Sequence, residues 1–263
     1  MADIIKGTDK KTGIRYMTFG HGTKTMVIIP GLSVGYVTDS AEAVAGAFAE
    51  FEEDFTVYLF DIREEVPENY TICQMGEDLV SAIKNLGLSQ IHLYGCSMGG
   101  MQAMYIAGTY PELVAKLVVV SSACKENDTA KNVISNWFDL AKNQKGVELM
   151  TDMGKRIYSP AVYEASKETF VMMAQSLTPD DINRFIYTAS GIANLDVTNE
   201  AKAIKCPMLV MGSNGDQVLT GKASQEIASI TGAEIYMYDE STSHAIYDEV
   251  PEVKTRAKEF FLK

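Results

Sequence analysis

Five residues near the middle of the chain, Gly95-Cys96-Ser97-Met98-Gly99, have the spacing G-x-S-x-G. The motif comes directly after an apolar run that ends at Gly95 and directly before a helical pattern, which is the context that it requires. A serine at this place sits in a sharp turn with strained backbone angles, so its neighbours must be small if strand and helix are to approach. The pattern predicts that Ser97 is a nucleophile held above the carboxyl ends of the strands, where open α/β sheets build their sites.

A serine hydroxyl is a weak nucleophile, and it needs a base that an acid holds in place. The chain has 3 histidines. His21 lies in a Gly-His-Gly turn, and His92 lies within the strand that leads to Ser97. His244 follows a late strand and precedes the last helix, so it is predicted to be the base.

The acid is expected in the loop after the strand at residues 207–212, where Asp216 is the candidate. Its carboxylate would orient the imidazole and stabilise the imidazolium. Asn-Gly-Asp is also an ordinary turn sequence. Glu126 and Asp128, which follow the strand at residues 116–122, therefore stay open as alternative acids.

The two neighbours of Ser97 have different expected roles. Met98 begins a helix, whose first N–H groups are free and lie at the positive end of the helix dipole. Its backbone N–H is the natural first donor to an oxyanion. Cys96 is not expected to be the nucleophile, because neighbours in such a turn point to opposite sides. With no C-x-x-C spacing, the 4 cysteines are interpreted as reduced thiols.

Short apolar runs alternate with helical patterns along most of the chain. Continuous apolar runs of this kind are typical of strands that are covered on both faces, as in a parallel sheet. Repeated strand–helix–strand units imply right-handed crossovers and a doubly wound sheet. Strands are expected at residues 25–31, 55–61, 91–95, 116–122, 207–212 and 234–239, with two shorter ones before residue 20 as an antiparallel edge, and helices at 40–53, 74–86, 222–231 and 251–262.

One region breaks this alternation. Residues 124–200 show no strand pattern, and Ser159-Pro160 and Thr178-Pro179 each place a capping residue before a proline at the first helical position. We predict a helical cap at 124–200, inserted into a core made of residues 1–123 and 201–263, in a single compact unit. Some of the many aromatic and methionine side chains of the cap are expected to line an apolar acyl pocket.

With the order Ser97, Asp216, His244 and with these late loops, the chain resembles the α/β-hydrolases of the capped, single-domain type. The resemblance covers nearly the whole chain and is least specific in the cap. It implies the α/β-hydrolase fold, which is a mostly parallel central sheet with helices on both faces and an inserted helical cap. It also implies a second oxyanion donor just after the first long strand, which would be the backbone N–H of Leu32.

The chain departs from the family's pattern at three places. Many relatives have His-Gly where this chain has Pro30-Gly31, and many have His where this chain has Cys96. Neither position supplies the triad, so the expected chemistry is retained while substrate analogies weaken. The Asp61-x-Arg63 pair is kept without the glycines that usually follow. We interpret Asp61 and Arg63 as structural rather than catalytic residues.

Charge and composition exclude several classes of partner. The formal net charge is −12 and no long basic run occurs, so a nucleic-acid or anionic-membrane partner is not expected. The polar start of the chain lacks an apolar core segment, and no run approaches the length of about 18 apolar residues that a membrane span needs. We expect a cytoplasmic protein. Metal-binding and nucleotide-binding motifs are absent from the sequence, so no cofactor or metal is expected.

The predicted function is that of a serine esterase, which cleaves a small-to-medium carboxylic ester through an acyl-enzyme on Ser97. The resemblance also allows carbon–carbon bond hydrolysis, thioester cleavage or peracid formation on the same triad, and the sequence does not separate these. A non-catalytic protein that binds a ligand in the capped pocket is a further alternative. The expected partner is a small acyl substrate, and the chain is expected to be a monomer or a homodimer.

Overall fold

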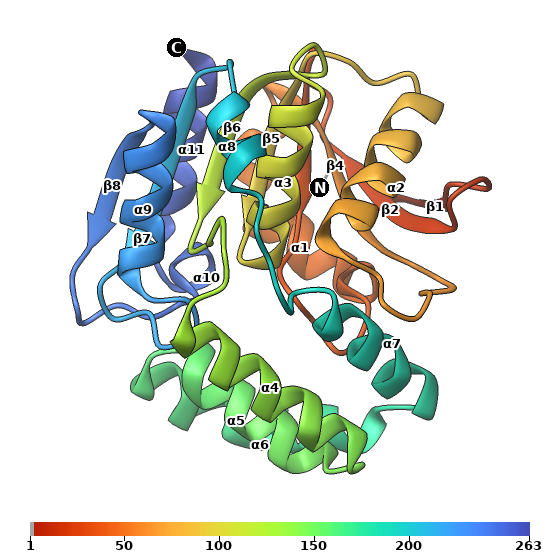
Figure 1. Cartoon of the computed structure of the whole chain (residues 1–263). Helices are drawn as coiled ribbons and strands as arrows, with labels where there is room; N and C mark the ends of the chain where they lie inside the picture. Colours follow the sequence, from red (N-terminus) through yellow and green to blue (C-terminus); the bar gives the residue numbers. More distant parts are fainter. Residues whose placement is uncertain (1–2) are drawn as a thin grey trace.

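The computed structural model describes residues 3–263, which form one eight-stranded sheet surrounded by helices (Figure 1). The strand order in the sheet is β1-β2-β4-β3-β5-β6-β7-β8. The first two strands pair antiparallel with each other, and β2 pairs antiparallel with β4, whereas all other neighbours are parallel. The strands are β1 (Ile5–Thr8), β2 (Ile14–Phe19), β3 (Lys24–Ile29), β4 (Phe55–Arg63), β5 (Ile91–Cys96), β6 (Val114–Val120), β7 (Met208–Ser213) and β8 (Glu234–Tyr238).

Both faces of the sheet are buried under helices. Alternate residues of β3 show this, because Val27 and Ile29 pack with one apolar cluster while Met26 and Ile28 pack with another. Side chains of a strand alternate between the faces, so a continuous apolar run is what a doubly covered strand requires. The first face carries α2 (Ile72–Asn85), α3 (Met98–Thr109), α8 (Thr198–Ala203) and α9 (Gly221–Thr231), and the second carries α1 (Ala41–Ala47) and α11 (Pro251–Leu262).

These features confirm the predicted fold class and the antiparallel edge. One predicted helix differs from the structure. Residues 40–53 do not form a single helix, but a 3-10 turn at Val37–Ser40, the short α1, and a second 3-10 turn at Ala49–Phe51. The break lies at Phe48, whose backbone angles (φ −114°, ψ 17°) leave the helical region. Its ring packs edge-on against Tyr94, so tertiary packing outweighs the helical periodicity there.

Four helices, and no strand, lie between β6 and α8. They are α4 (Asp128–Lys142), α5 (Gly146–Ile157), α6 (Pro160–Ser176) and α7 (Pro179–Ser190). Figure 1 shows α4, α5 and α6 grouped together below the lower end of the sheet. The division of the chain at residues 124 and 200 stays a prediction, and α8, which crosses the second boundary, packs against α3. None of the helices within residues 3–263 is both long enough and apolar enough to cross a membrane.

The predicted caps of the inserted helices have different outcomes. Thr178 forms a reciprocal capping box, in which its hydroxyl accepts from the Asp181 N–H while its own N–H donates to the Asp181 carboxylate at 2.9 Å. Ser159 makes no side-chain capping bond. Its backbone N–H instead donates to Glu249 at 2.8 Å, which joins the start of α6 to the short helix α10 (Ile246–Glu249).

A close backbone approach lies at Gly99, and it generates a stability prediction. A Cβ atom at Gly99 would lie 2.0 Å from the carbonyl oxygen of Ile29, whereas a Cβ at Gly46 on α1 would meet nothing within 4 Å. Gly99→Ala should therefore lower the free energy of unfolding by about 2–4 kcal/mol, because backbone must move. Gly46→Ala should raise it by up to about 1 kcal/mol through better helix propensity. Urea unfolding of both variants checks this, and equal effects would contradict it.

Candidate active site

Ser97 is the single residue between the end of β5 and the start of α3, and its backbone has a positive φ (φ 52°, ψ −122°). Such angles strain a residue other than glycine, at a typical cost of about 1–3 kcal/mol, and persist only where the surroundings impose them. Here the surroundings are small residues. A Cβ atom at Gly95 would lie 2.5 Å from the Gly99 carbonyl oxygen, and one at Gly100 would lie 2.6 Å from the Ser122 side chain. The predicted steric reason for the glycines is thus visible in the structure.

The hydroxyl of Ser97 lies within hydrogen-bonding distance of a histidine. His244 Nε2 is 3.0 Å from Ser97 Oγ, and His244 Nδ1 is 2.8 Å from Asp216 Oδ2. The three residues come from the loops after β5, β7 and β8, so parallel strands bring their carboxyl ends to one edge of the sheet. This arrangement of a hydroxyl, an imidazole and a carboxylate matches the geometry that activates a serine hydroxyl in serine hydrolases.

Asp216 is buried, and two backbone groups hold its second oxygen. Val218 and Leu219 donate their N–H groups to Asp216 Oδ1 at 2.7 and 2.9 Å. Burial by itself would raise the pKa of this carboxyl, but the charge and hydrogen bond of His244 together with the two amides outweigh it. The pKa of Asp216 is therefore held below its usual range, and the group remains an acceptor for the imidazole.

The other candidate acids and bases lie elsewhere. The carboxylate of Glu126 is 4.0 Å from the Lys131 ammonium group, and Asp128 is the first residue of α4. The carboxylate that contacts His244 Nδ1 is that of Asp216. His92 points its ring between two phenylalanine rings at 5.2 and 5.3 Å, and burial lowers its pKa. His21 is exposed in the turn before β3.

Backbone N–H groups near Ser97 are available for an oxyanion. Met98 is the first residue of α3, so its N–H has no acceptor within the helix. Gly31 lies against the serine, since a Cβ atom there would be 3.1 Å from Ser97 Cβ, and Leu32 follows it in the loop after β3. The positions suit the expected roles of Met98 and Leu32, and those roles stay a prediction.

Cys96 is unsuited to act as the nucleophile. Its thiol is buried and lies 3.9 Å from the carbonyl oxygen of Ile29. Burial, with a smaller contribution from the charge of Asp248, raises the pKa of the thiol to about 12. A thiol with this pKa is protonated at neutral pH, and the thiolate is the reactive form of cysteine.

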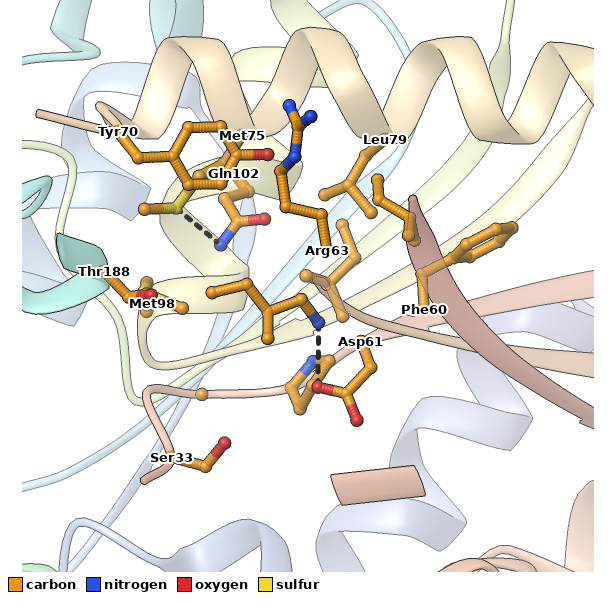
Figure 2. A pocket seen from close by; sticks show the side chains of 15 residues that line it. Ser33, Phe60, Asp61, Arg63, Tyr70, Met75, Leu79, Met98, Gln102 and Thr188 are labelled. Carbon is orange, nitrogen blue, oxygen red and sulfur yellow. Dashed lines mark hydrogen bonds between the residues drawn. The ribbon is translucent and has the colours of Figure 1, made fainter. Parts of the chain in front are cut away.

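Asp61 and Arg63 hold neighbouring segments in place. The Asp61 carboxylate accepts hydrogen bonds from the Thr38 N–H at 2.8 Å, the Thr38 hydroxyl at 3.0 Å and the Ile62 N–H at 2.8 Å, and burial raises its pKa. Arg63 pairs with Asp78 of α2 at 2.7 Å. Figure 2 shows the two side chains pointing apart around a small cavity of about 40 Å³. Asp61 thus anchors the chain that follows the Leu32 loop.

Two supporting residues were missed by reasoning from the sequence. Glu249 accepts a hydrogen bond from the Ser243 hydroxyl at 2.8 Å, and that hydroxyl accepts from the Ala245 N–H at 3.0 Å, so both bonds flank His244. Tyr247 packs edge-on against the imidazole, with ring centroids 6.0 Å apart. The only available signal was the run of acidic and aromatic residues after the histidine, which is not specific.

A family model for the alpha/beta hydrolase fold matches residues 24–251 of the chain. The chain belongs to the α/β-hydrolase fold family. Its relatives include a Haemophilus influenzae protein provisionally named esterase/lipase, which is 26% identical over 250 residues that cover 91% of this chain and 83% of that protein. The 3-oxoadipate enol-lactonase 2 of Acinetobacter baylyi is 23% identical over 221 residues, which cover 81% and 79% of the two chains.

Solved structures agree with this assignment of the fold. An alpha/beta hydrolase enzyme from a Medee basin deep-sea metagenome library superposes with a TM-score of 0.86 at 23% identity, covering 98% of each chain. The enol-lactonase of Burkholderia xenovorans LB400 superposes with a TM-score of 0.80 at 20% identity, covering 95% of this chain and 96% of that one. Family and relatives together support a hydrolase.

Three cavities in this α/β-hydrolase share lining residues near Ser97. A narrow chamber of about 20 Å³ is lined by Ser97, His244 and Leu32. A cavity of about 730 Å³ shares Leu32 and Tyr247 with the chamber, and a cavity of about 370 Å³ shares Met101 with it. Both larger cavities therefore border the chamber that Ser97 lines.

The lowered pKa of Asp216 generates a prediction about stability and pH. A carboxyl whose pKa is lower in the folded state stabilises the fold above its unfolded pKa, ordinarily near 3.8, and loses this contribution as the pH falls through the lower folded value. Asp216→Asn should lower the free energy of unfolding by about 1–3 kcal/mol at pH 5, and this difference should shrink towards pH 3. Urea unfolding across this range measures it. A difference that stays constant would contradict the prediction.

Proposed function

We propose that this protein is a serine hydrolase that cleaves a small-to-medium carboxylic ester through an acyl-enzyme on Ser97. The observation that carries the proposal is the continuous line of hydrogen bonds from Ser97 Oγ through His244 to Asp216, at 3.0 and 2.8 Å. Each of the three groups lies in a loop at the carboxyl edge of the sheet. The Asp216 carboxylate is buried, and it also accepts hydrogen bonds from two backbone N–H groups.

In the acylation step, His244 Nε2 takes the proton from Ser97 as its oxygen attacks the ester carbonyl carbon. The carbonyl oxygen gains negative charge, which the N–H groups of Met98 and Leu32 stabilise. Asp216 accepts the hydrogen bond of the other imidazole nitrogen and stabilises the positive charge that develops on the ring. The protonated imidazole then gives its proton to the departing alkoxide, which leaves as an alcohol.

Deacylation repeats these steps with water. His244 removes a proton from a water molecule, whose oxygen attacks the acyl carbon. Collapse of the second tetrahedral intermediate returns the proton to Ser97 and releases the carboxylic acid. No group other than the side chains and amides described above is needed for this sequence.

The names of the relatives support acyl chemistry. The proteins matched are named as an esterase/lipase, an enol-lactonase and carbamate hydrolases. Esters, lactones and carbamates all present a carbonyl carbon to a nucleophile, which is the part of the substrate that Ser97 would attack. The proposed substrate is therefore a small-molecule acyl compound with an ester as its simplest form.

Ser97→Ala tests the proposal. The variant should lose about four to six orders of magnitude in the turnover of para-nitrophenyl esters, because the covalent step is removed. Ser229→Ala, which changes an exposed serine on α9, should leave turnover unchanged. Turnover is measured by release of the nitrophenolate, with circular dichroism as the check on folding. Near-normal turnover in the Ser97 variant would refute the assignment.

A fluorophosphonate probe separates this proposal from its alternatives. It should modify Ser97 of the wild-type protein and leave the Ser97→Ala variant unmodified, as judged by the mass of the intact chain. Modification with turnover of an ester panel of increasing acyl length supports the esterase. Modification without turnover of any ester would favour a thioester, a carbon–carbon bond or a peracid reaction, or a ligand-binding role for the same pocket.

A further inference from the structure

The larger of the two cavities that share lining residues with the Ser97 chamber is a candidate ligand site. It measures about 730 Å³, and it reaches from the cap residues Met150 and Phe170 past Leu32 down to Phe48 and Tyr94 beneath α1. Ligand sites are mostly apolar with few polar groups that fix orientation, so the polar residues in this wall are the ones that select a ligand. Three of the lining residues are acidic, and none of them is a lysine or an arginine.

Two of the three acidic residues are already paired with cations. Asp39 accepts from Arg15 at 2.6 Å, and Asp181 pairs with Arg184 of α7. Both guanidinium groups stack on one aromatic ring, since each lies within 3.9 Å of the Tyr36 ring centroid. These contacts neutralise the two carboxylates at the side of the cavity near the Leu32 loop.

Asp248 differs from the other two acidic residues. It lies on the short helix α10 (Ile246–Glu249), and its carboxylate forms no ion pair with any residue of the described range 3–263. Its hydrogen bond comes from the Tyr158 hydroxyl, at a long 3.3 Å. Lys254, a nearby base, donates instead to the Tyr247 carbonyl oxygen at 2.6 Å.

The surroundings of Asp248 leave its carboxylate oxygens free to accept further hydrogen bonds. The Asp248 side chain is exposed and lines the cavity, and desolvation by the surrounding protein still raises the pKa of the carboxyl. A carboxylate in such a place gains from a hydrogen-bonding cation that comes with a ligand. A second polar group of the same wall, the fully buried Tyr94 hydroxyl, has no hydrogen-bonding partner among the described residues.

Aromatic rings complete the lining around this carboxylate. Tyr158 and Tyr247 flank Asp248 in the cavity wall, and Phe170 packs on Tyr158 with ring centroids 5.8 Å apart. Aromatic faces attract an ammonium group that has lost part of its water, and a carboxylate beside them adds a direct ion pair. The formal net charge of −12 further favours a cation over an anion near the molecule.

We propose that the large cavity binds a cationic amine through Asp248 and Tyr158, so that the preferred substrates are acyl compounds that carry an alkylammonium group. This inference rests on the proposed function for the part that concerns substrates, whereas binding of the amine stands by itself. A carboxylate-bearing compound of the same size is disfavoured, because no basic residue lines the cavity and Asp248 would repel it.

Direct binding tests the amine site without any turnover. Hexylammonium, hexanol and hexanoate have the same chain and differ in charge, and isothermal titration calorimetry measures their binding to the wild-type protein. Hexylammonium should bind at least about tenfold more tightly than hexanol, and hexanoate should bind most weakly. Absence of hexylammonium binding, or equal binding of hexanoate, would overturn the proposal.

Variants localise the site. Asp248→Asn should weaken hexylammonium binding by about tenfold or more while changing hexanol binding less than about twofold. Glu42→Gln removes the same charge from an exposed position on α1, outside the cavity lining, and should leave hexylammonium binding unchanged. Tyr158→Phe, which removes the hydroxyl that holds Asp248, should weaken binding severalfold. Equal loss in the Asp248 and Glu42 variants would indicate general electrostatic attraction and overturn the site.

Inhibition connects the amine site with the substrate. Hexylammonium should inhibit the hydrolysis of para-nitrophenyl acetate by the wild-type protein and should do so about tenfold less well in Asp248→Asn. Binding without inhibition would overturn the assignment of the cavity to the substrate. A protein that binds hexylammonium but hydrolyses no ester would contradict the proposed esterase and leave the amine site intact.

Discussion

The strained backbone of Ser97 is the constraint on which the rest of the site depends. A residue other than glycine keeps a positive φ only when its neighbours leave it no other choice. Here α3 approaches β3 so closely that Gly99 touches the Ile29 carbonyl, and this contact is possible only because Gly99 lacks a side chain. Backbone packing between a helix and two strands thus fixes the position of Ser97. The imidazole that contacts its hydroxyl must therefore be positioned by other parts of the chain.

The imidazole is brought to the serine by a different kind of contact. His244 lies in a loop after the short edge strand β8, where no regular structure restrains the chain. Glu249 supplies the restraint, because one of its oxygens accepts from Ser243 beside the histidine and the other accepts from the Ser159 N–H at the start of α6. The inserted helices therefore serve the site in two ways, as walls of the cavities and as an anchor for the histidine loop.

The sequence predicts well those parts of the structure that depend on local spacing. The G-x-S-x-G motif and the strand runs reflect short-range rules, and the strand positions agree with the structure to within about two residues. The structure also favours Asp216 over Glu126, a choice that spacing left open. What decides it is how the loops after β6 and β7 run in space, and no local pattern contains that information.

The parts that could not be predicted depend on contacts between distant segments. The break at Phe48 arises from its packing on Tyr94, which lies 46 positions further along the chain (94 − 48). Arg15 and Arg184 each stack on the ring of Tyr36, and these three residues come from segments that share no sequence motif. Asp39 and Asp181, which pair with these arginines, look like solvated surface in a sequence, and only the fold shows that they line a cavity.

Two carboxyl groups near one histidine show how the fold assigns different tasks to the same side chain. Asp216 accepts two amides and the imidazole, so charged groups and donors surround it and its pKa is lowered despite burial. Asp248 is exposed at the cavity wall, has one long hydrogen bond and no ion-pair partner in the described chain, and desolvation by the surrounding protein raises its pKa. A carboxylate that is fully satisfied can orient a base, and it has nothing left to offer a ligand. A carboxylate that is incompletely satisfied is poorly suited to that task, but it can recognise a cation. The number of donors that each loop presents therefore separates the proposed acid of the triad from the proposed amine-binding group of the cavity.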